Sequence, residues 1–357
     1  MILWNTTRGE RLAPLTPERR MRQYTRVTQR RRCANRSGLP VANEGYMYKT
    51  ILVPLDGSTF SAKAIPVAAA LAKRSGAALH LVTVLDPSAY VPFVPGEVLV
   101  PVMDTDALSA RRNADEAAMS SVATTLAAEG VRATSRVIEG TVVEALSEHA
   151  TAVGADLVIM TTHGRSGLER LWLGSVATSF LHRAPCPVFL VRPSGETGPD
   201  PADPLPLGTL LVPLDGSRFA DTIVPHAVVF SQSVGVPICL FTVAIPNAIP
   251  MAPFGTHALL ADEGDLTRRE DDARKRLGTL AASLPEGATM DVATDMTAAR
   301  AIIEKATSCG SGVIAMATHG RTGIARLVMG SVADAVLRSA PQAMLLYRPT
   351  DLETQSK

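Results

Sequence analysis

The chain has 357 residues, of which 46% are hydrophobic and 19% charged, so it can form the cores of two domains of ordinary size. Aromatic residues make up only 4%, and cores built mainly of Ala, Val, Leu and Ile suit a parallel sheet covered by helices on both faces. The net charge is +1, but residues 1–46 carry ten Arg against three Glu, which leaves the remainder at −6 and excludes a broad nucleic-acid-binding surface there.

Cysteine usage and hydropathy predict the compartment. The four cysteines form no C-x-x-C pair, which argues against a disulfide framework or a structural zinc site and indicates a reducing environment. No apolar run approaches the roughly 18 residues that a membrane span needs. We therefore expect a cytoplasmic protein that has neither a membrane nor a nucleic acid as a partner.

Residues 1–46 form an Arg-rich extension without a clear period, and we expect it to be disordered. A tail that tethers the protein to nucleic acid or membrane, a transit peptide and an arm without function are all open interpretations. A lone serine, Ser37, argues against the transit peptide. Met47 runs directly into the first expected strand, so translation from Met47 is a further alternative.

From residue 47 onward, short apolar runs alternate with segments of helical period. Ile51–Leu55 is the first expected strand, and Ser58 is placed to cap a helix over Thr59–Ser75, in which Pro66 predicts a kink. Further strands are expected over residues 78–85, 131–138, 156–161 and 187–191, and further helices over 106–129, 142–153 and 175–182. This alternation predicts an α/β fold with a doubly wound, Rossmann-like parallel sheet of five strands.

The second half of the chain repeats the first, which predicts two such sheets in tandem. Three blocks recur in the same order: LVPLDGS at 52–58 and 211–217, THGR at 162–165 and 318–321, and GSVA at 174–177 and 330–333. The predicted organisation is an extension over residues 1–46, a first copy over 47–193, a Pro- and Gly-rich linker over 194–207, a second copy over 208–350 and a tail over 351–357.

A glycine-containing loop after the fourth strand of each copy carries the expected chemistry. In the first copy, Gly164 is followed by nine residues and then by Gly174 and Ser175, which open a helix; Gly320 and Gly330 repeat this spacing. Glycines let the backbone approach an anion closely, and a helix N-terminus offers unpaired N–H donors with a favourable dipole. No Lys follows as in a Walker loop, so the pattern predicts a different phosphate cradle.

On these residues the chain resembles the universal stress protein family in its tandem form, over about residues 47–350. The likeness includes the Pro-Leu-Asp-Gly-Ser opening at 54–58 and the Met-x-Thr-His-Gly-Arg phrase at 160–165. It implies a fold of the adenine nucleotide alpha hydrolase-like type, and ATP, with or without Mg²⁺, as the ligand. It assigns the adenosine end to Asp56, Val84, Asp215 and Val243, and the phosphates to Gly164, Gly174, Ser175, Val176, Gly320, Gly330, Ser331 and Val332.

Several of these assignments have alternatives. Arg165 and Arg321 can reach phosphate oxygens, but they can equally be solvated surface residues. Asp56 and Asp215 can simply cap the helices that follow them, and the motif glycines can serve only as tight turns. His163 and His319 are interpreted as structural, because no nucleophile with an orienting acid can be paired with either of them.

Two departures from the family motif rank the first site above the second. The first glycine of the motif is Thr161 in one copy and Ala317 in the other, which is costly only if that backbone needs a positive φ. Gly140, after the third strand, is replaced by Met296 in the second copy, and a bulky side chain there could obstruct the mouth of the site.

Three functions are therefore compared. The first is an ATP-binding regulator of the stress response with no or very slow hydrolysis, because no catalytic base or metal-binding carboxylate pair is evident. The second is a nucleotide-free module that binds protein partners. The third, an adenylating enzyme, would be expected to carry a Ser-Gly-Gly-type loop where this chain has Leu55-Asp56-Gly57-Ser58.

Pairing of the final strands is a further expectation from the resemblance, because family members commonly dimerise in this way. Pro187–Val191 and Ala343–Tyr347 would then pair within one chain and make it its own pseudodimer, with Phe189 close to Leu345. A further homodimer of whole chains stays open.

Overall fold

The computed structural model describes residues 47–90, 105–162, 174–192, 204–205, 208–246, 263–318 and 330–349. The predictions for residues 1–46, for most of the linker and for the tail fall outside these ranges. No helix among the described residues is long and apolar enough to cross a bilayer.

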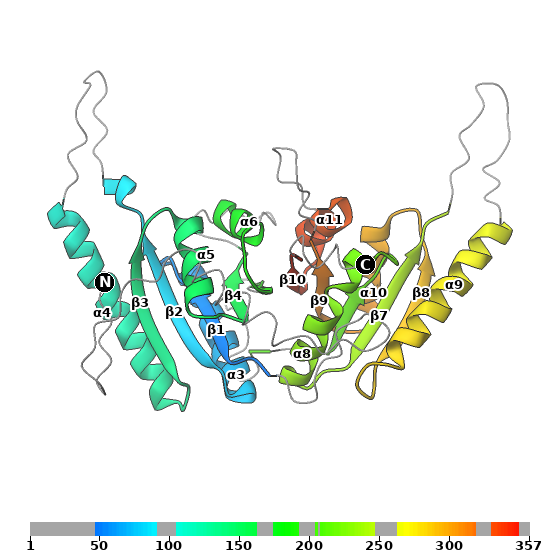
Figure 1. Cartoon of the computed structure of the whole chain (residues 1–357), viewed down its shortest axis with the longest axis horizontal. Coiled ribbons are helices and arrows are strands. Elements are labelled where there is room, and N and C mark those ends of the chain that lie inside the picture. Colours follow the sequence, from blue (N-terminus) through cyan, green and yellow to red (C-terminus); the bar gives the residue numbers. More distant parts are fainter. Residues whose placement is uncertain are drawn as a thin grey trace, which may run out of the picture. The chain divides into compact units, whose positions relative to one another are not determined.

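Strands and helices alternate within the described part of each copy (Figure 1). In the first copy they are β1 (Thr50–Pro54), α2 (Thr59–Ala62), α3 (Ala64–Ser75), β2 (Ala78–Leu85), the 3-10 turn η1 (Pro87–Tyr90), α4 (Thr105–Ala128), β3 (Ala133–Glu139), α5 (Val142–Ala152), β4 (Leu157–Thr161), α6 (Ser175–Leu181) and β5 (Val188–Val191). In the second copy they are β6 (Thr209–Pro213), α7 (Arg218–Asp221), α8 (Val224–Val234), β7 (Ile238–Ala244), α9 (Glu263–Ala281), β8 (Thr289–Thr294), α10 (Ala298–Ser308), β9 (Ser311–Ala317), α11 (Ser331–Ser339) and β10 (Ala343–Tyr347).

The predicted first helix is broken into α2 and α3. Ser58 is the N-cap of α2, as expected, because its hydroxyl accepts the N–H of Ser61 at 3.1 Å. Pro66 is the third residue of α3, where its missing N–H removes no hydrogen bond. Pro225 is the second residue of α8 in the second copy. The expected kink is therefore a break just before each proline.

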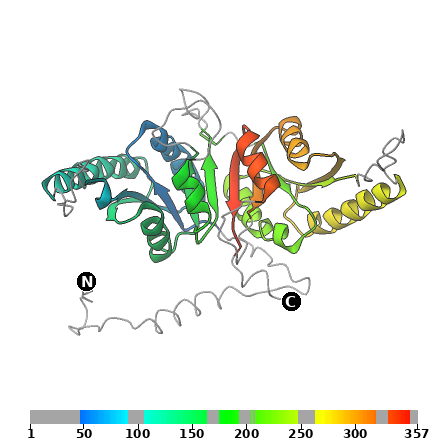
Figure 2. The same cartoon turned by 90° about the horizontal axis from the view of Figure 1, so that it is seen from above.

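The sheet order explains both the parallel halves and the way in which they join. The order is β3-β2-β1-β4-β5-β10-β9-β6-β7-β8, parallel within each copy and antiparallel at the seam between β5 and β10. Figure 2 shows the red strand β10 beside the green strand β5. Leu345 lies opposite Phe189 in the seam, so the predicted pairing of the final strands is confirmed and the two five-stranded sheets form one.

One apolar cluster runs through both copies. In the first copy it joins Leu52, Val82 and Val158, from alternating positions of three neighbouring strands, to Leu146 of α5 and Phe180 of α6. The same cluster continues into residues of the second copy on β6, β7, β9, β10, α10 and α11. The two copies therefore share a core across the seam.

Contacts outside the sheet reinforce this seam. The rings of Phe189 on β5 and Phe230 on α8 lie 4.9 Å apart at 51°, a favourable tilted arrangement. The link between the copies is also reciprocal, because Arg192 donates to the Leu337 carbonyl and Arg348 donates to the His182 carbonyl. Each copy thus places an arginine on the last helix of the other.

Candidate functional site

The carboxyl ends of β1 and β4 define the place where a ligand is expected. These strands are neighbours, and the chain leaves β1 toward β2 on one side but later reaches β4 on the other. Such a reversal of strand order opens a crevice at the carboxyl edge of a parallel sheet. The turn after β1 and the start of α6, after β4, both lie at this edge.

The turn after β1 presents Asp56 at the surface. Its carboxylate accepts the N–H of Ser58 at 2.9 Å, and its own N–H donates to the Ser61 hydroxyl at 3.2 Å. Gly57 has a φ of 77°, a conformation that favours glycine. The helix cap is the hydroxyl of Ser58, so Asp56 holds the turn rather than the helix. Asp215 accepts an equivalent N–H at 2.9 Å in the second copy.

The start of α6 exposes backbone donors. Gly174 is the N-cap and makes no side-chain hydrogen bond to the helix, while its N–H donates to the carbonyl of Thr162 at 2.9 Å and so fixes the helix start at the end of β4. Ser175 and Val176, the first helical residues, are exposed. Gly330 is likewise the N-cap of α11 without a side-chain cap. Both helices therefore leave first-turn N–H groups for an external acceptor.

The substituted motif glycines lie in ordinary strand backbone. Thr161 is the last residue of β4 and pairs with Val191, and Ala317 is the last residue of β9 and pairs with Tyr347. Among the described residues, none except glycine has a positive φ. A side chain therefore strains neither position, and this departure from the motif does not by itself weaken the site.

The replacement of Gly140 is partly an insertion. In both copies the last residue of the second strand pairs with the last residue of the third strand. After this pair, the first copy has one residue, Gly140, before the helix N-cap Thr141, whereas the second copy has two residues, Asp295 and Met296, before the helix N-cap Thr297. Gly140 has a φ of 139°, which its longer counterpart avoids. The Asp295 carboxylate accepts the Thr297 N–H at 2.7 Å, and the Met296 residue is 58% exposed. The simple exchange of Gly for Met predicted from the sequence is therefore corrected to a turn that is one residue longer.

The sequence profile of the Universal stress protein family matches both repeats, over residues 47–192 and 207–348. The chain belongs to the universal stress protein family. A universal stress protein of Mycolicibacterium smegmatis is 27% identical over 305 residues, which cover 84% of this chain and 97% of the relative. Universal stress protein MJ0531 of Methanocaldococcus jannaschii is 32% identical over 152 residues, 43% of this chain and 86% of the relative.

Solved structures of universal stress proteins share the fold of the whole tandem chain. One from Archaeoglobus fulgidus has a TM-score of 0.61 at 19% identity and covers 85% of this chain and 99% of its own. A putative universal stress protein from Pseudomonas aeruginosa has a TM-score of 0.60 at 16% identity and covers 87% and 97%. At these identities the likeness establishes the doubly wound architecture of both copies and nothing finer.

Sequence reasoning missed a cation beside the first site of this universal stress protein. A Cβ atom built on Gly57 would lie 3.5 Å from Nη2 of Arg111, while one built on Gly216 meets nothing within 4 Å. Arg111 is on α4, where its Nε donates to Asp115 at 2.8 Å. No motif marks this residue, because it reaches the Asp56 turn only through the packing of α4 against the sheet.

A second difference concerns the helix that would hold the phosphates. Asp334 stands in the first turn of α11 and pairs with Arg338 at 2.8 Å, whereas the matching position of α6 is Thr178. A carboxylate near a helix N-terminus competes with a bound anion for the same positive potential. The second site is therefore poorer for phosphate by this criterion as well.

The remaining predicted site residues divide into two groups. Val84 and Val243 are partly buried near the ends of β2 and β7 and pack against the shared core. The loop residues Gly164, Arg165, Gly320 and Arg321, and also His163 and His319, lie outside the described residues. The structure thus brings the Asp56 turn and the start of α6 to the same sheet edge, and the loop assignments stay predictions.

Proposed function

We propose that the first copy binds an adenine nucleotide, with ATP the preferred one, and that the protein acts as a nucleotide-dependent regulator of the stress response. The observation that carries the proposal is the exposed, uncapped start of α6 at the carboxyl edge of the sheet. Its N–H groups and dipole suit phosphate oxygens, which need no lysine when backbone donors are available.

The other end of the nucleotide would face the Asp56 turn. A carboxylate accepts hydrogen bonds from ribose hydroxyls or from an amine, and Asp56 stands after β1, the strand that neighbours β4. Arg111 places a guanidinium beside the same turn, with its Nε paired to Asp115 at 2.8 Å, and the second copy has no contact of this kind at Gly216. These groups fit an adenine nucleotide with its phosphates on α6.

We propose that the protein hydrolyses bound ATP very slowly or not at all. No group of three His, Cys, Asp or Glu side chains in the described ranges is placed to hold a metal ion. A Mg²⁺ ion that enters with ATP would then be held mainly by phosphates and water, as is common for this ion. A resident nucleotide that is turned over slowly suits a protein that reports nucleotide state to partners.

The decisive test compares the two copies in the intact chain. The purified protein is denatured and the released nucleotide is identified by mass spectrometry, alongside thermal shifts with ATP, AMP and cyclic AMP. Gly174→Val places a branched side chain at the start of α6, and because Gly174 has a φ of −57° any residue can adopt its backbone. Gly330→Val is the matched variant in the second copy.

We expect near one equivalent of ATP from the wild type and from Gly330→Val, and little from Gly174→Val. Two further exchanges, Thr178→Asp and Asp334→Thr, should weaken the first site and improve the second, each by about 1 kcal/mol or roughly fivefold, the size of a helix-terminal charge effect. A folded wild type that releases no nucleotide and shows no shift with any of the three would refute nucleotide binding. The result would then favour the nucleotide-free interaction module.

A further inference from the structure

A pocket of about 270 Å³ lies on the first copy, between β2, β3 and the end of α5, away from the nucleotide edge. Its lining is His80, Leu81, Thr134, Ser135, Arg136, His149 and Val153. His80 is five positions before Leu85, the last residue of β2, which places it about 16 Å from the carboxyl edge at about 3.3 Å per residue. The site proposed for the nucleotide does not use any of these residues.

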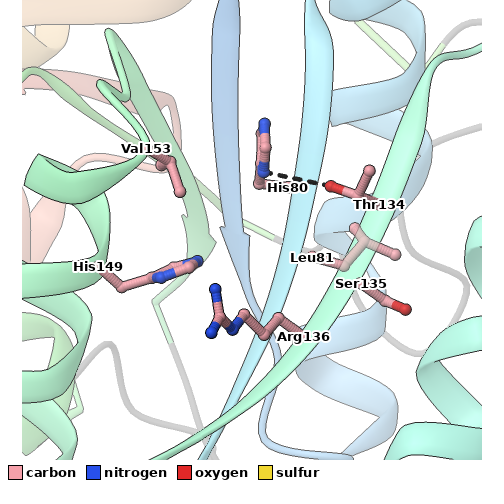
Figure 3. A pocket seen from close by; sticks show the side chains of 7 residues that line it. All are labelled: His80, Leu81, Thr134, Ser135, Arg136, His149 and Val153. Atoms are coloured by element: carbon pink, nitrogen blue, oxygen red, sulfur yellow. Dashed lines mark hydrogen bonds between the residues drawn. The ribbon is translucent and has the colours of Figure 1, made fainter. Parts of the chain in front are cut away.

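Three basic side chains from three elements converge on this pocket. Figure 3 shows the guanidinium of Arg136 next to the ring of His149, with the ring of His80 on the same side of the pocket. The hydroxyl of Thr134, on β3 beside His80, lies 3.2 Å from Nδ1 of His80 and so fixes the orientation of that ring. The arrangement presents guanidinium and imidazole nitrogens to one volume.

The lining contains no carboxylate to neutralise these groups. The titratable and charged side chains of the lining are His80 from β2, Arg136 from β3 and His149 from α5. A neighbouring hollow on the α4 side of β3, which Arg136 also lines, contains the carboxylate of Glu116, and this carboxylate is paired with Arg112 at 3.8 Å. Burial lowers the pKa of His80. Burial, and then the charges of Arg136 and His80, lower the pKa of His149. It is therefore unfavourable for His80 and His149 to be protonated at the same time unless an anion binds beside them.

The second copy provides the counterexample within the same chain. Cys239 pairs with Thr289 as His80 pairs with Thr134, and Lys305 is the eighth residue of α10 as His149 is of α5. The position of Arg136 is taken by Asp291, whose carboxylate accepts from Lys305 at 2.6 Å. The backbone is shared, but the second copy holds a neutral ion pair where the first copy holds only bases.

We propose that His80, Arg136 and His149 form a binding site for a tetrahedral oxyanion, namely a phosphate group. Arginine matches two oxygens of such an anion with its planar fork, and each histidine adds a charged donor when it is protonated. Binding is coupled to proton uptake by the two imidazoles. Occupancy therefore rises as the pH falls, which makes the first copy responsive to phosphate and acidity together.

The experiment uses the full chain, with calorimetric titration and NMR of the histidine ring protons. Sulfate is the probe for pH dependence, because its charge is constant between pH 6 and 8. Inorganic phosphate and methyl phosphate then distinguish the free ion from the phosphoryl group of an ester. Arg136→Gln changes an exposed strand residue and should leave the fold intact. Lys305→Gln is the matched change in the second copy, and Gly174→Val reports on the nucleotide site.

We expect saturable sulfate binding at pH 6 that shifts the signals of His80 and His149 and weakens at least tenfold at pH 8. Arg136→Gln should weaken it at least tenfold, because the charged hydrogen bonds of the guanidinium to the anion are lost. Lys305→Gln and Gly174→Val should have no effect. Binding of both phosphates supports a site that also accepts phosphate esters, and binding of inorganic phosphate alone supports a site for the free ion. No saturable sulfate binding at pH 6, or wild-type affinity in Arg136→Gln, overturns the proposal.

Discussion

The contacts across the seam make a quantitative prediction for Phe189→Ala. Phe189 is 2% exposed on β5, faces Leu345 of the other copy and stacks on Phe230 of α8. Loss of a buried Phe side chain costs about 3–5 kcal/mol, from lost transfer free energy and the cavity left behind. Because the ring contacts the second copy, much of this loss should fall on the coupling between the copies rather than on the first copy alone.

Differential scanning calorimetry of the full chain separates these contributions. The wild type should unfold in one transition, and Phe189→Ala should unfold in two, because the copies then melt independently. Phe241→Ala is the control, since Phe241 is 1% exposed but lies on β7 of the second copy, away from the seam. It should lower the melting temperature by a similar free energy and keep one transition. A Phe189→Ala protein with one transition and a loss below about 1 kcal/mol would refute the argument that the seam contacts of Phe189 couple the two copies.

Three further predictions follow from individual contacts. Cysteines placed at Phe189 and Leu345 should form a disulfide within the monomer, seen as an intrachain crosslinked peptide by mass spectrometry, because directly opposed antiparallel residues lie within reach of one. Burial, and then the charge of Asp156, raise the pKa of the Cys186 thiol far above its ordinary value, so native protein should not be alkylated there at pH 8, whereas unfolded protein should. The lowered pKa values of His80 and His149 mean that the unfolded chain binds protons more readily. The free energy of unfolding should therefore keep its full value above about pH 6.5 and decrease as the pH falls below it. In denaturant melts at matched pH values, this decrease should be smaller for a His80→Asn/His149→Gln variant.

Local sequence signals were sufficient for most of the framework. The alternation of apolar residues predicted β2 over Ala78–Leu85 without error, because both ends are marked, by Gly76 and by Pro87. The position of Ser58 predicted its cap, and the duplicated blocks predicted the repeat of the fold. The break before Pro66 was half predicted, since a proline marks a disturbance but the sequence does not show on which side the helix gives way.

The side chains that distinguish the two sites could not be predicted in this way. Arg111 reaches the turn at Gly57 only because α4 packs against β2 and β3. His80, Arg136 and His149 lie on three separate elements, and their convergence depends on the register of β2 with β3 and on the position of α5. No short spacing in a sequence records such contacts, whereas a motif on one loop does.

A consistent pattern links the differences between the copies. The first copy places three bases, His80, Arg136 and His149, around one pocket. The second copy places Asp334 at the start of its last helix and an ion pair of Lys305 with Asp291 at the corresponding position. Each change makes the first copy more favourable to anions than the second, on a backbone that the two share. Since the seam joins both cores, the second copy can stabilise the first without binding a ligand itself. Ligand affinity should therefore depend on the first copy, and mutations in the second should act on it through stability.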